Sequence, residues 1–297
     1  MLSSTPFFSI VVPTYNRAHL IDKTITTIIT QEFKDFELII VDDGSTDHTA
    51  SVVNAFTDQR ITYLKKVNAE RGASRNYGRD HSQGKYINYF DSDDLMYPNH
   101  LQVAYQFIQE KKSPELIHLG YDFKTLEGVV TRKVNTLNEN STNQILFENL
   151  LSCNGVFLRR DVAVKFPFEE NRILASAEDW ELWIRLICRY PILYHNEITT
   201  SVVGHDERSI RTIAVDKLIA RDLYLIQTME NDTIVLNRYG KSFSRFIAER
   251  YTFIMLGLSK SNEFGKVFSW ALRAFHKYPG ILLTKRFWAS IKNSLVK

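Results

Sequence analysis

Apolar runs alternate with amphipathic segments along the first 112 residues. Four short runs rich in β-branched and aromatic residues predict buried strands, at 7–12, 37–41, 61–64 and 86–90. Four segments between or after them carry apolar residues at helical spacing, at 17–31, 45–56, 72–82 and 98–112. Alternating helices and continuously apolar strands predict an α/β fold, with a mostly parallel sheet covered by helices on both faces.

The pattern changes twice further along the chain. Strands are predicted at 115–123, 128–132, 155–158, 192–194 and 198–203, and helices at 143–151 and 178–190. After about residue 213 the pattern is helical only, with interruptions near Gly240, Ser261 and Pro279. We therefore predict two domains, an α/β domain over 1–210 and a helical C-terminal subdomain over 211–297.

Composition narrows the class of protein. The chain has 297 residues, of which 44% are hydrophobic and 24% charged, and a net charge of +3 is too small to indicate a nucleic-acid partner. Cys153 and Cys188 lack metal-ligand spacing, so we expect free thiols in a reducing compartment. No stretch reaches about 18 apolar residues and the N-terminus lacks a signal-peptide pattern, so we expect a cytoplasmic protein.

Carboxylates gather where two of the predicted strands end. Asp42 and Asp43 follow the second strand, and Asp91, Asp93 and Asp94 follow the fourth. Ligands of parallel sheets bind outside the carboxyl ends of the strands, so both groups are expected on one rim. Clustered acids repel one another unless a positive group lies between them, and their oxygens suit Mg²⁺ or Mn²⁺, which would hold a phosphate. A polar turn or a helix cap is the alternative for each group alone.

Five motifs occur in a family-specific order. They are FSIVVPTYNR (8–17), IIVDDGSTD (39–47), Arg71-Gly72 with Arg75-Asn76, GKYINYFDSDD (84–94) and AEDWELWIRL (177–186). In this order they resemble family 2 glycosyltransferases, over about residues 7–210. The resemblance implies a GT-A (Rossmann-like) fold and an inverting transfer from a nucleotide-sugar donor. It also implies a nucleotide-sugar half over about 1–95 and an acceptor half over about 96–210, with 153–155 near the acceptor pocket.

The resemblance implies a set of nucleotide-sugar contacts. These are Pro13, Thr14, Tyr15, Asn16, Asp42, Asp43, Arg71, Arg75, Asp91 and Ser92. In the family the residue matching Asp43 accepts a hydrogen bond from the uracil N3–H, and an ionised carboxylate suits that imide because it only accepts. The segment between Arg71 and Asn76 is shorter than the family pattern. Which arginine contacts the diphosphate therefore stays open, and an exposed helix arginine is the alternative for each.

The metal site and the catalytic base are implied in the same way. Asp93 is the first choice for holding Mn²⁺ or Mg²⁺, Asp91 lies toward the metal or the ribose, and His205 is a further candidate ligand. Asp179 is the expected base for the acceptor hydroxyl, with Glu178 as the substitute. The alternative explanation for this pair is that acids at a helix N-terminus stabilise the helix by capping and by the dipole. One base suffices for direct displacement with inversion.

The predicted function is transfer of a sugar from a UDP-sugar to a hydroxyl of a glycan or lipid-linked acceptor, in polysaccharide or cell-envelope biosynthesis. The alternative is a nucleotide-sugar-binding or nucleotidyltransferase-like protein on the same fold, although no G-x-x-x-x-G-K-[ST] motif is present. The basic amphipathic segment 263–297 indicates either peripheral contact with the inner face of the cytoplasmic membrane or packing on the protein or a second copy. The donor sugar, the linkage and the oligomeric state stay open.

Overall fold

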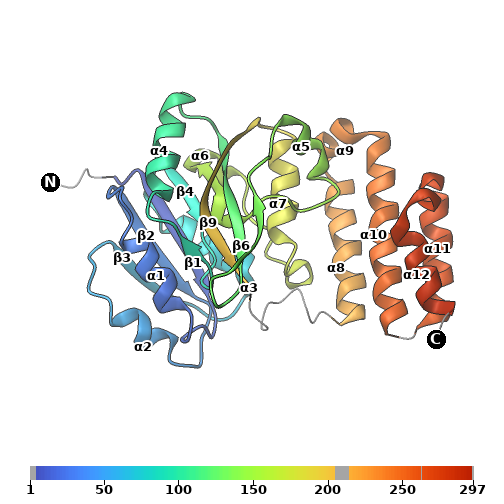
Figure 1. Cartoon of the computed structure of the whole chain (residues 1–297), viewed down its shortest axis with the longest axis horizontal. Coiled ribbons are helices and arrows are strands. Elements are labelled where there is room, and N and C mark those ends of the chain that lie inside the picture. The colour runs from blue at the N-terminus through green and yellow to red at the C-terminus, as the bar shows by residue number, and fades with distance from the viewer. Residues whose placement is uncertain (1–4, 205–213, 262, 296–297) are drawn as a thin grey trace. The chain divides into compact units, whose positions relative to one another are not determined.

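The computed structural model describes residues 5–204, 214–261 and 263–295 (Figure 1). These residues fall into two compact units. The first contains the described residues up to 145 together with 149–204, and the second contains 146–148 together with the described residues from 214 onward. His205, a predicted metal ligand, lies outside the described residues.

A single mixed sheet forms the first unit. Its strands are β1 (Phe8–Thr14), β2 (Phe36–Asp42), β3 (Ile61–Lys65), β4 (Tyr86–Tyr89), β5 (Leu95–Met96), β6 (Leu116–Lys124), β7 (Val130–Val134), β8 (Val156–Arg159) and β9 (Ile192–Val203). The strand order is β3-β2-β1-β4-β8-β6-β9-β5, with β7 beside β6. Strands β3, β2, β1 and β4 are parallel, as are β6 and β9, whereas β8 runs antiparallel to both β4 and β6. The predicted α/β sheet is confirmed.

Helices cover both faces of this sheet. They are α1 (Ile21–Ile29), α2 (Thr49–Asn54), α3 (Glu70–Asp80), α4 (His100–Glu110), α5 (Glu139–Gln144), α6 (Arg160–Lys165) and α7 (Glu178–Ile187), with short 3₁₀ turns at Cys153–Gly155 and Arg172–Leu174. Alternate β1 residues, such as Ile10, share one apolar cluster with α1 and α4. On the other face α3 packs so closely that a Cβ on Gly78 would lie 2.4 Å from Cγ1 of Val11.

Two local predictions were wrong. The helix expected at 143–151 is instead α5, because Asn138 starts it earlier: its side chain accepts from the Asn140 N–H while Ser141 Oγ accepts from the Asn138 N–H. The strands expected at 192–194 and 198–203 are one strand, β9. Its register against β6 shifts where Asn196 and Glu197 interrupt the apolar pattern. Strand β5 and helix α6 were not predicted.

The second unit is helical. It contains α8 (Val215–Glu230), α9 (Thr233–Tyr239), α10 (Lys241–Lys260), α11 (Phe264–Lys277), the 3₁₀ helix η4 (Pro279–Leu283) and α12 (Lys285–Leu295). The breaks fall at Gly240, near Ser261 and at Pro279, as predicted. Apolar side chains of α10, α11 and α12 form its core. Across 5–204, 214–261 and 263–295, no helix combines the length and the apolarity needed to cross a membrane.

Candidate active site

The first part of the site is the loop after β1. Pro13 and Thr14 are buried at the end of the strand, whereas the side chain of Tyr15 is 46% exposed. Asn16 has a φ of +52° and ties this loop to the loop after β2. Its N–H donates to Ser45 Oγ (2.9 Å) and its Oδ1 accepts from the Thr46 N–H (2.9 Å). These bonds fix the residue next to Tyr15, which stays partly exposed at the rim.

Asp42 is buried below that rim. Its Oδ1 accepts from the Ser45 N–H (2.6 Å), and its Oδ2 accepts from the hydroxyl of Tyr63 on β3. Burial, together with this hydrogen bond and the negative charge of Asp42, raises the pKa of Tyr63. Asp42 therefore holds the turn after β2 against the neighbouring strand, and its predicted contact with a nucleotide stays a prediction.

Asp43 organises the start of α3. Its Oδ1 accepts from Lys66 Nζ (2.7 Å) and the Ala69 N–H (2.9 Å), and its Oδ2 accepts from the Glu70 N–H (2.9 Å). A carboxylate that accepts from free N–H groups at a helix start stabilises that helix by capping and by the dipole. Three of its roughly four acceptor positions are used in this way.

Arg75 lies at the centre of the site. Its guanidinium, on a residue only 2% exposed, donates from Nη2 to Asp91 Oδ1 (2.9 Å) and from Nη1 to Glu178 Oε1 (2.8 Å). It also lies over the Phe168 ring, 5.1 Å from the centroid. Arg75 therefore joins the end of β4 to the start of α7. It supplies positive charge to Asp91, one of the clustered acids for which a positive neighbour was expected.

Two further arginines lie beside these acids. Arg17 Nε is 3.8 Å from Asp93 Oδ2, and the Arg17 N–H donates to Thr49 Oγ1. Arg71 lies on the exposed side of α3, one turn before Arg75. Desolvation opposes its charged form, but the carboxylates of Glu178 and Asp91 outweigh this and raise the pKa of Arg71. Arg17 was not among the predicted site residues, although it ends the motif that follows β1.

Asn154 fixes the turn that carries the β4 acids. Its Oδ1 accepts from the Asp91 N–H (3.0 Å), and its Nδ2 donates to Asp94 Oδ2 (2.7 Å). Asp94, 1% exposed, also accepts from the Val203 N–H of β9 (2.8 Å), so Asp94 is a structural residue. The carbonyl of Ser92 accepts from the hydroxyl of Thr24. Asp91 and Asp93 are therefore presented at the rim by a turn that is anchored on both sides.

Asp179 stands next to this array at the start of α7. Its Oδ1 accepts from the Trp180 N–H (2.7 Å) and its Oδ2 from the Asn149 side chain (3.0 Å). Burial, and then the negative charge of Glu178, raise the pKa of Asp179 to about 6. A carboxylate with this pKa is ionised at neutral pH and basic enough to accept a proton. Asn149 was not predicted, because it is far from Asp179 in sequence and belongs to no motif.

Backbone strain gathers around the same rim. Among the described non-glycine residues, five have a positive φ, and three of them border the site: Asn16, Glu70 and Ser176. Asn16 lies in the loop after β1, Glu70 comes directly before Arg71 in α3, and Ser176 lies in the loop before Glu178. Such conformations are costly and persist where the surrounding contacts impose them, which is common at functional sites.

The acids at the rim fit a hard cation in part. The described residues include no group of three or more histidines, cysteines or acids placed to hold a metal by themselves. Mg²⁺ and similar ions are often held by only one or two carboxylates together with phosphates of the substrate, however. Asp91 and Asp93 provide that number of carboxylates, and both already attract a guanidinium, so this donor set suits a divalent cation beside a diphosphate.

Comparison with known proteins identifies the family. Residues 9–150 match the model "Glycosyl transferase family 2". This segment is a family 2 glycosyltransferase domain. It includes β1 to β7 and therefore the rim residues from Pro13 to Asp93. The chain spans about a quarter to a third of the length of the first curated relatives it matches, which are uncharacterized glycosyltransferases of Rickettsia.

Other similar proteins agree with this glycosyltransferase domain. The chain is 28% identical to the Escherichia coli UDP-Glc:alpha-D-GlcNAc-diphosphoundecaprenol beta-1,3-glucosyltransferase WfgD over 180 residues. The aligned segment covers 60% of this chain and 69% of WfgD. The structure of Staphylococcus aureus TarS (residues 1–349) in complex with UDP-GlcNAc superposes with a TM-score of 0.70 at 18% identity. The superposition covers 97% of this chain and 89% of the TarS chain. The mannosyltransferase PcManGT of Pyrobaculum calidifontis, in complex with GDP-Man and Mn²⁺, superposes with a TM-score of 0.59 at 14% identity. The superposition covers 99% of this chain and 87% of PcManGT. The expected GT-A fold is confirmed.

Proposed function

We propose that this protein transfers a sugar from a UDP-sugar donor to a hydroxyl of a glycan or lipid-linked acceptor, with inversion at the anomeric carbon. The observation that carries the proposal is the charge array around Arg75. One buried guanidinium joins Asp91, an acid of the phosphate side, to Glu178, the neighbour of a carboxylate whose pKa is raised to about 6. Donor and base groups are thereby held within one connected network.

The donor's nucleoside would lie on the rim formed by the loops after β1 and β2. Tyr15 offers an exposed ring for stacking on the base. Asp43 keeps an acceptor position beyond its three hydrogen bonds, and an acceptor is what a uracil imide requires. Arg71, exposed on α3, is placed to pair with the diphosphate at the rim, whereas the guanidinium of Arg75 belongs to a residue only 2% exposed. These assignments favour Arg71 over Arg75 as the phosphate contact.

Asp93 and Asp91 are the residues that would hold Mn²⁺ or Mg²⁺. When bound, such an ion supplies Lewis-acid stabilisation of the charge on the departing nucleoside diphosphate. The Mn²⁺ named in the PcManGT complex supports this assignment. Asp94 takes no part, because its carboxylate is committed to Asn154 and Val203.

Asp179 is the proposed base. It accepts the proton of the acceptor hydroxyl as that oxygen attacks the anomeric carbon and the bond to the diphosphate breaks. The Trp180 N–H and the Asn149 side chain orient its two oxygens. Glu178 is less suited, because its Oε1 already accepts from buried Arg75; it acts as a positioning residue for Arg75.

The choice of UDP draws support from two similar proteins. TarS forms complexes with UDP-GlcNAc and with UDP, and the name of WfgD specifies a UDP-glucose donor and a diphosphoundecaprenol-linked acceptor. Asp43 is the feature of this chain that agrees with them. A GDP- or dTDP-sugar is the substitute to be tested next.

The test combines binding and turnover. Purified protein is titrated with UDP by calorimetry, once with Mn²⁺ and once with EDTA, and UDP release is then measured from UDP-glucose and UDP-GlcNAc. We expect metal-dependent binding that Asp93→Ala weakens, and turnover that Asp179→Asn abolishes without loss of binding. Asp161→Asn, on a surface ion pair with Arg159, is the matched control and should leave both unchanged. Binding of UDP without turnover of any donor would favour the nucleotide-sugar-binding alternative.

A further inference from the structure

Helix α11 in the second unit has three chemically different sides. One side is buried in the unit's core and consists of Val267, Trp270, Ala271 and Ala274. A second side carries Phe268, Leu272 and Phe275, at i, i+4 and i+7, which are 48%, 58% and 38% exposed. A helix on the surface of a folded domain normally has one apolar side, so a second, exposed one indicates a further contact.

The segments after α11 extend this apolar character. In η4 Leu282 and Leu283 are 36% and 91% exposed, and in α12 Trp288 is 55% exposed. The Trp288 Nε1–H donates to the Leu282 carbonyl (2.6 Å), which holds the indole beside η4. Six of the fifteen exposed large hydrophobic side chains among the described residues therefore fall between 268 and 288. This concentration is higher than isolated surface residues explain.

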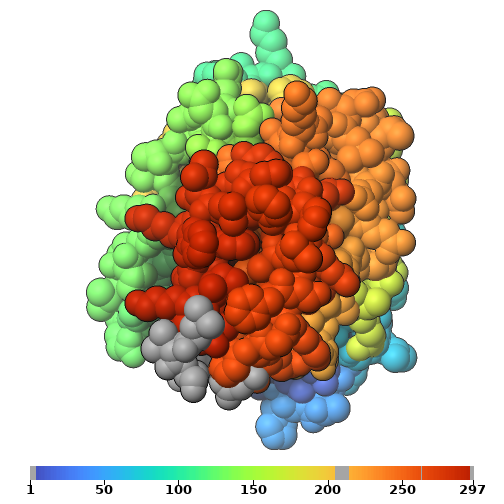
Figure 2. Space-filling model, turned by 90° about the vertical axis from the view of Figure 1, so that its right-hand side faces the viewer, coloured from blue at the N-terminus to red at the C-terminus, as the bar shows by residue number. Residues whose placement is uncertain are grey.

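Charge in the same region has one sign. Residues 263–295 contain six lysines and arginines, at 266, 273, 277, 285, 286 and 292, and a single acid, Glu263. Figure 2 shows the surface that α11, η4 and α12 form, coloured red. Helical spacing places the α11 cations Lys266, Arg273 and Lys277 on a third side of that helix, away from its exposed apolar side. On α12, Lys285, Trp288 and Lys292 recur at i, i+3 and i+7 and are all exposed, so they share one side. We call the surface defined by Phe268, Leu272, Phe275, Leu283, Trp288, Lys285 and Lys292 the basic apolar face.

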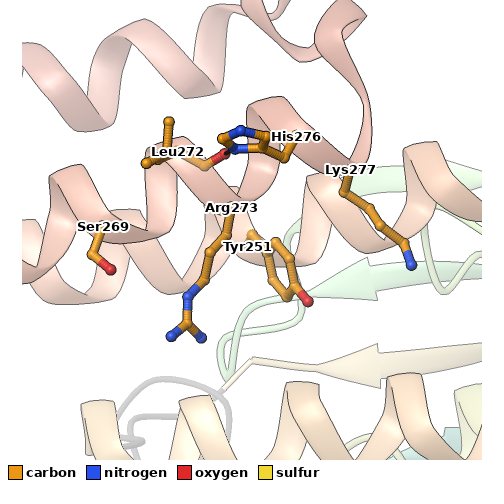
Figure 3. A pocket seen from close by; sticks show the side chains of 6 residues that line it. All are labelled: Tyr251, Ser269, Leu272, Arg273, His276 and Lys277. Carbon is orange, nitrogen blue, oxygen red and sulfur yellow. Dashed lines mark hydrogen bonds between the residues drawn. The ribbon is translucent and has the colours of Figure 1, made fainter.

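A pocket adjoins the exposed side of α11. It has a volume of about 500 Å³ and is lined by Tyr251 of α10 and by Ser269, Leu272, Arg273, His276 and Lys277 of α11. Arg273, Tyr251 and Lys277 extend in the same direction from their helices in Figure 3. Lys277 Nζ is 3.7 Å from Glu230 Oε1, but both side chains are exposed and such a pair is weak. Leu272 also lines the pocket, but in Figure 3 it points away from Arg273 and Lys277, so these cations lie on a different side of α11 from its exposed apolar side.

We propose that the basic apolar face binds the surface of a bilayer that contains anionic phospholipids. The phenylalanine, leucine and tryptophan side chains enter the interface, and the exposed Lys285 and Lys292 beside Trp288 pair with lipid phosphates. Trp288 suits this position because an indole has an apolar body and a polar N–H. The helices lie on the membrane, since none of those in the described chain could span it.

A second copy of the chain is a poorer occupant of the face. Two such faces in contact would bring together Lys285 and Lys292 of both copies, with no acid among the residues that define the face to compensate. An anionic lipid surface removes that repulsion and accepts the apolar groups at the same time. Charge complementarity therefore favours the membrane.

Trp288 provides the measurement. The chain has four tryptophans, and Trp180, Trp183 and Trp270 are no more than 9% exposed, so Trp288 is the one that senses a new environment. The full chain is mixed with vesicles of phosphatidylglycerol or of phosphatidylcholine, and tryptophan emission and co-sedimentation are recorded. We expect a blue shift and co-sedimentation with phosphatidylglycerol alone, weakened by high salt.

Variants then test each part of the face. Leu283→Glu is expected to weaken binding by at least about tenfold, and Lys285→Glu and Lys292→Glu by about fivefold each. Leu126→Glu, at a 59% exposed leucine of the first unit, is the matched control and should bind normally. Trp288→Phe should lose the emission shift and retain co-sedimentation.

Three results would overturn the proposal. They are no co-sedimentation with phosphatidylglycerol, equal binding to both lipids, and self-association without vesicles that Leu283→Glu removes. The last would make a second copy the occupant. Vesicle binding requires no nucleotide, so its failure would leave the proposed transfer reaction untouched, and the reverse also holds.

Discussion

Two pairs of acids end strands β2 and β4, which lie on either side of β1, and the pairs differ in what their carboxylates do. Asp42 and Asp43, the β2 acids, accept from backbone N–H groups, from Tyr63 and from Lys66. Asp91 and Asp93, the β4 acids, face guanidinium groups, and the Asp91 side chain is still 33% exposed. The β2 acids therefore fix two loops, whereas the β4 acids present charge at the rim.

The difference shows that two similar acidic motifs in one site can have different tasks, one holding loops in place and the other presenting negative charge to a ligand. Hydrogen bonds from local N–H groups tie a carboxylate to the fold. A carboxylate that stays partly exposed at the rim can instead hold a metal ion that binds a phosphate. The four predictions below test this division, and they begin with the largest expected effect.

Replacing the proposed base should separate activity from stability. Asp179→Asn is expected to lower sugar transfer by about a thousandfold, the scale of a lost general base. Because the folded pKa of about 6 lies above the ordinary value of 3.8, ionised Asp179 destabilises the fold above pH 6. The variant should therefore raise the free energy of unfolding by about 1–2 kcal/mol at pH 7.5. Denaturant unfolding at pH 7.5 and 4 checks this, since the gain should disappear below pH 4.

Removing the central cation should destabilise the fold. Arg75→Met leaves Asp91 and buried Glu178 without their shared partner, and we expect a loss of about 3 kcal/mol in the free energy of unfolding. Lys111→Met, which breaks an exposed pair with Glu110, is the control and should cost less than about 0.5 kcal/mol. Equal, small losses in both variants would mean that Arg75 contributes no more than a surface pair.

The two pairs of acids should fail in different assays. Asp43→Ala removes the acceptor for two backbone N–H groups at the start of α3, and we expect it to cost about 1–2 kcal/mol of stability. Asp93→Ala should change stability by less than about 0.5 kcal/mol and remove the dependence of UDP binding on Mn²⁺. Urea unfolding and calorimetry on both variants decide this. A reversed result, with Asp93 structural and Asp43 dispensable for folding, would contradict the division.

The smallest effect concerns the pH dependence of transfer. Activity should decline on the acidic side with a midpoint near pH 6, because protonated Asp179 cannot accept a proton. The Asn149 hydrogen bond favours the ionised form, so Asn149→Ala should move the midpoint upward by roughly half a pH unit. Removing the like charge with Glu178→Gln should move it downward. Rates measured from pH 4.5 to 8.5 test both signs, and an unmoved midpoint would assign the acidic limb to another group.

Patterns in the sequence were sufficient for most of the fold. Continuous apolar runs located the strands β1 to β4, and apolar residues at helical spacing located the helices between them. The helix breaks at Gly240, near Ser261 and at Pro279 followed from composition. Helix α5 was misplaced because a cap at Asn138 outweighed the apolar pattern after it. The two parts of β9 were separated because a polar pair in a strand resembles a turn.

The motifs proposed which residues form the site, and the contacts that connect those residues were not predicted. Motifs located Asp43, Asp91, Asp93 and Asp179. That Arg75 would be buried between two of the acids, leaving Arg71 exposed, depends on which side of α3 meets the sheet. Arg17 and Asn149 reach the site through contacts with residues distant in sequence, for which a single chain carries no pattern.

Two glycines of α3 define the tolerance with which the site's charges are placed. A Cβ on Gly78 would lie 2.4 Å from Val11 Cγ1, and one on Gly72 would lie 2.4 Å from the Glu169 carbonyl oxygen. The helix is thus seated between the sheet and the segment at 168–169 with less clearance than a methyl group on either side. Because Arg71 and Arg75 flank Gly72, their positions are set by this seating depth. A methyl group added at either glycine would push α3 away from its neighbour and shift both arginines relative to the acids they face.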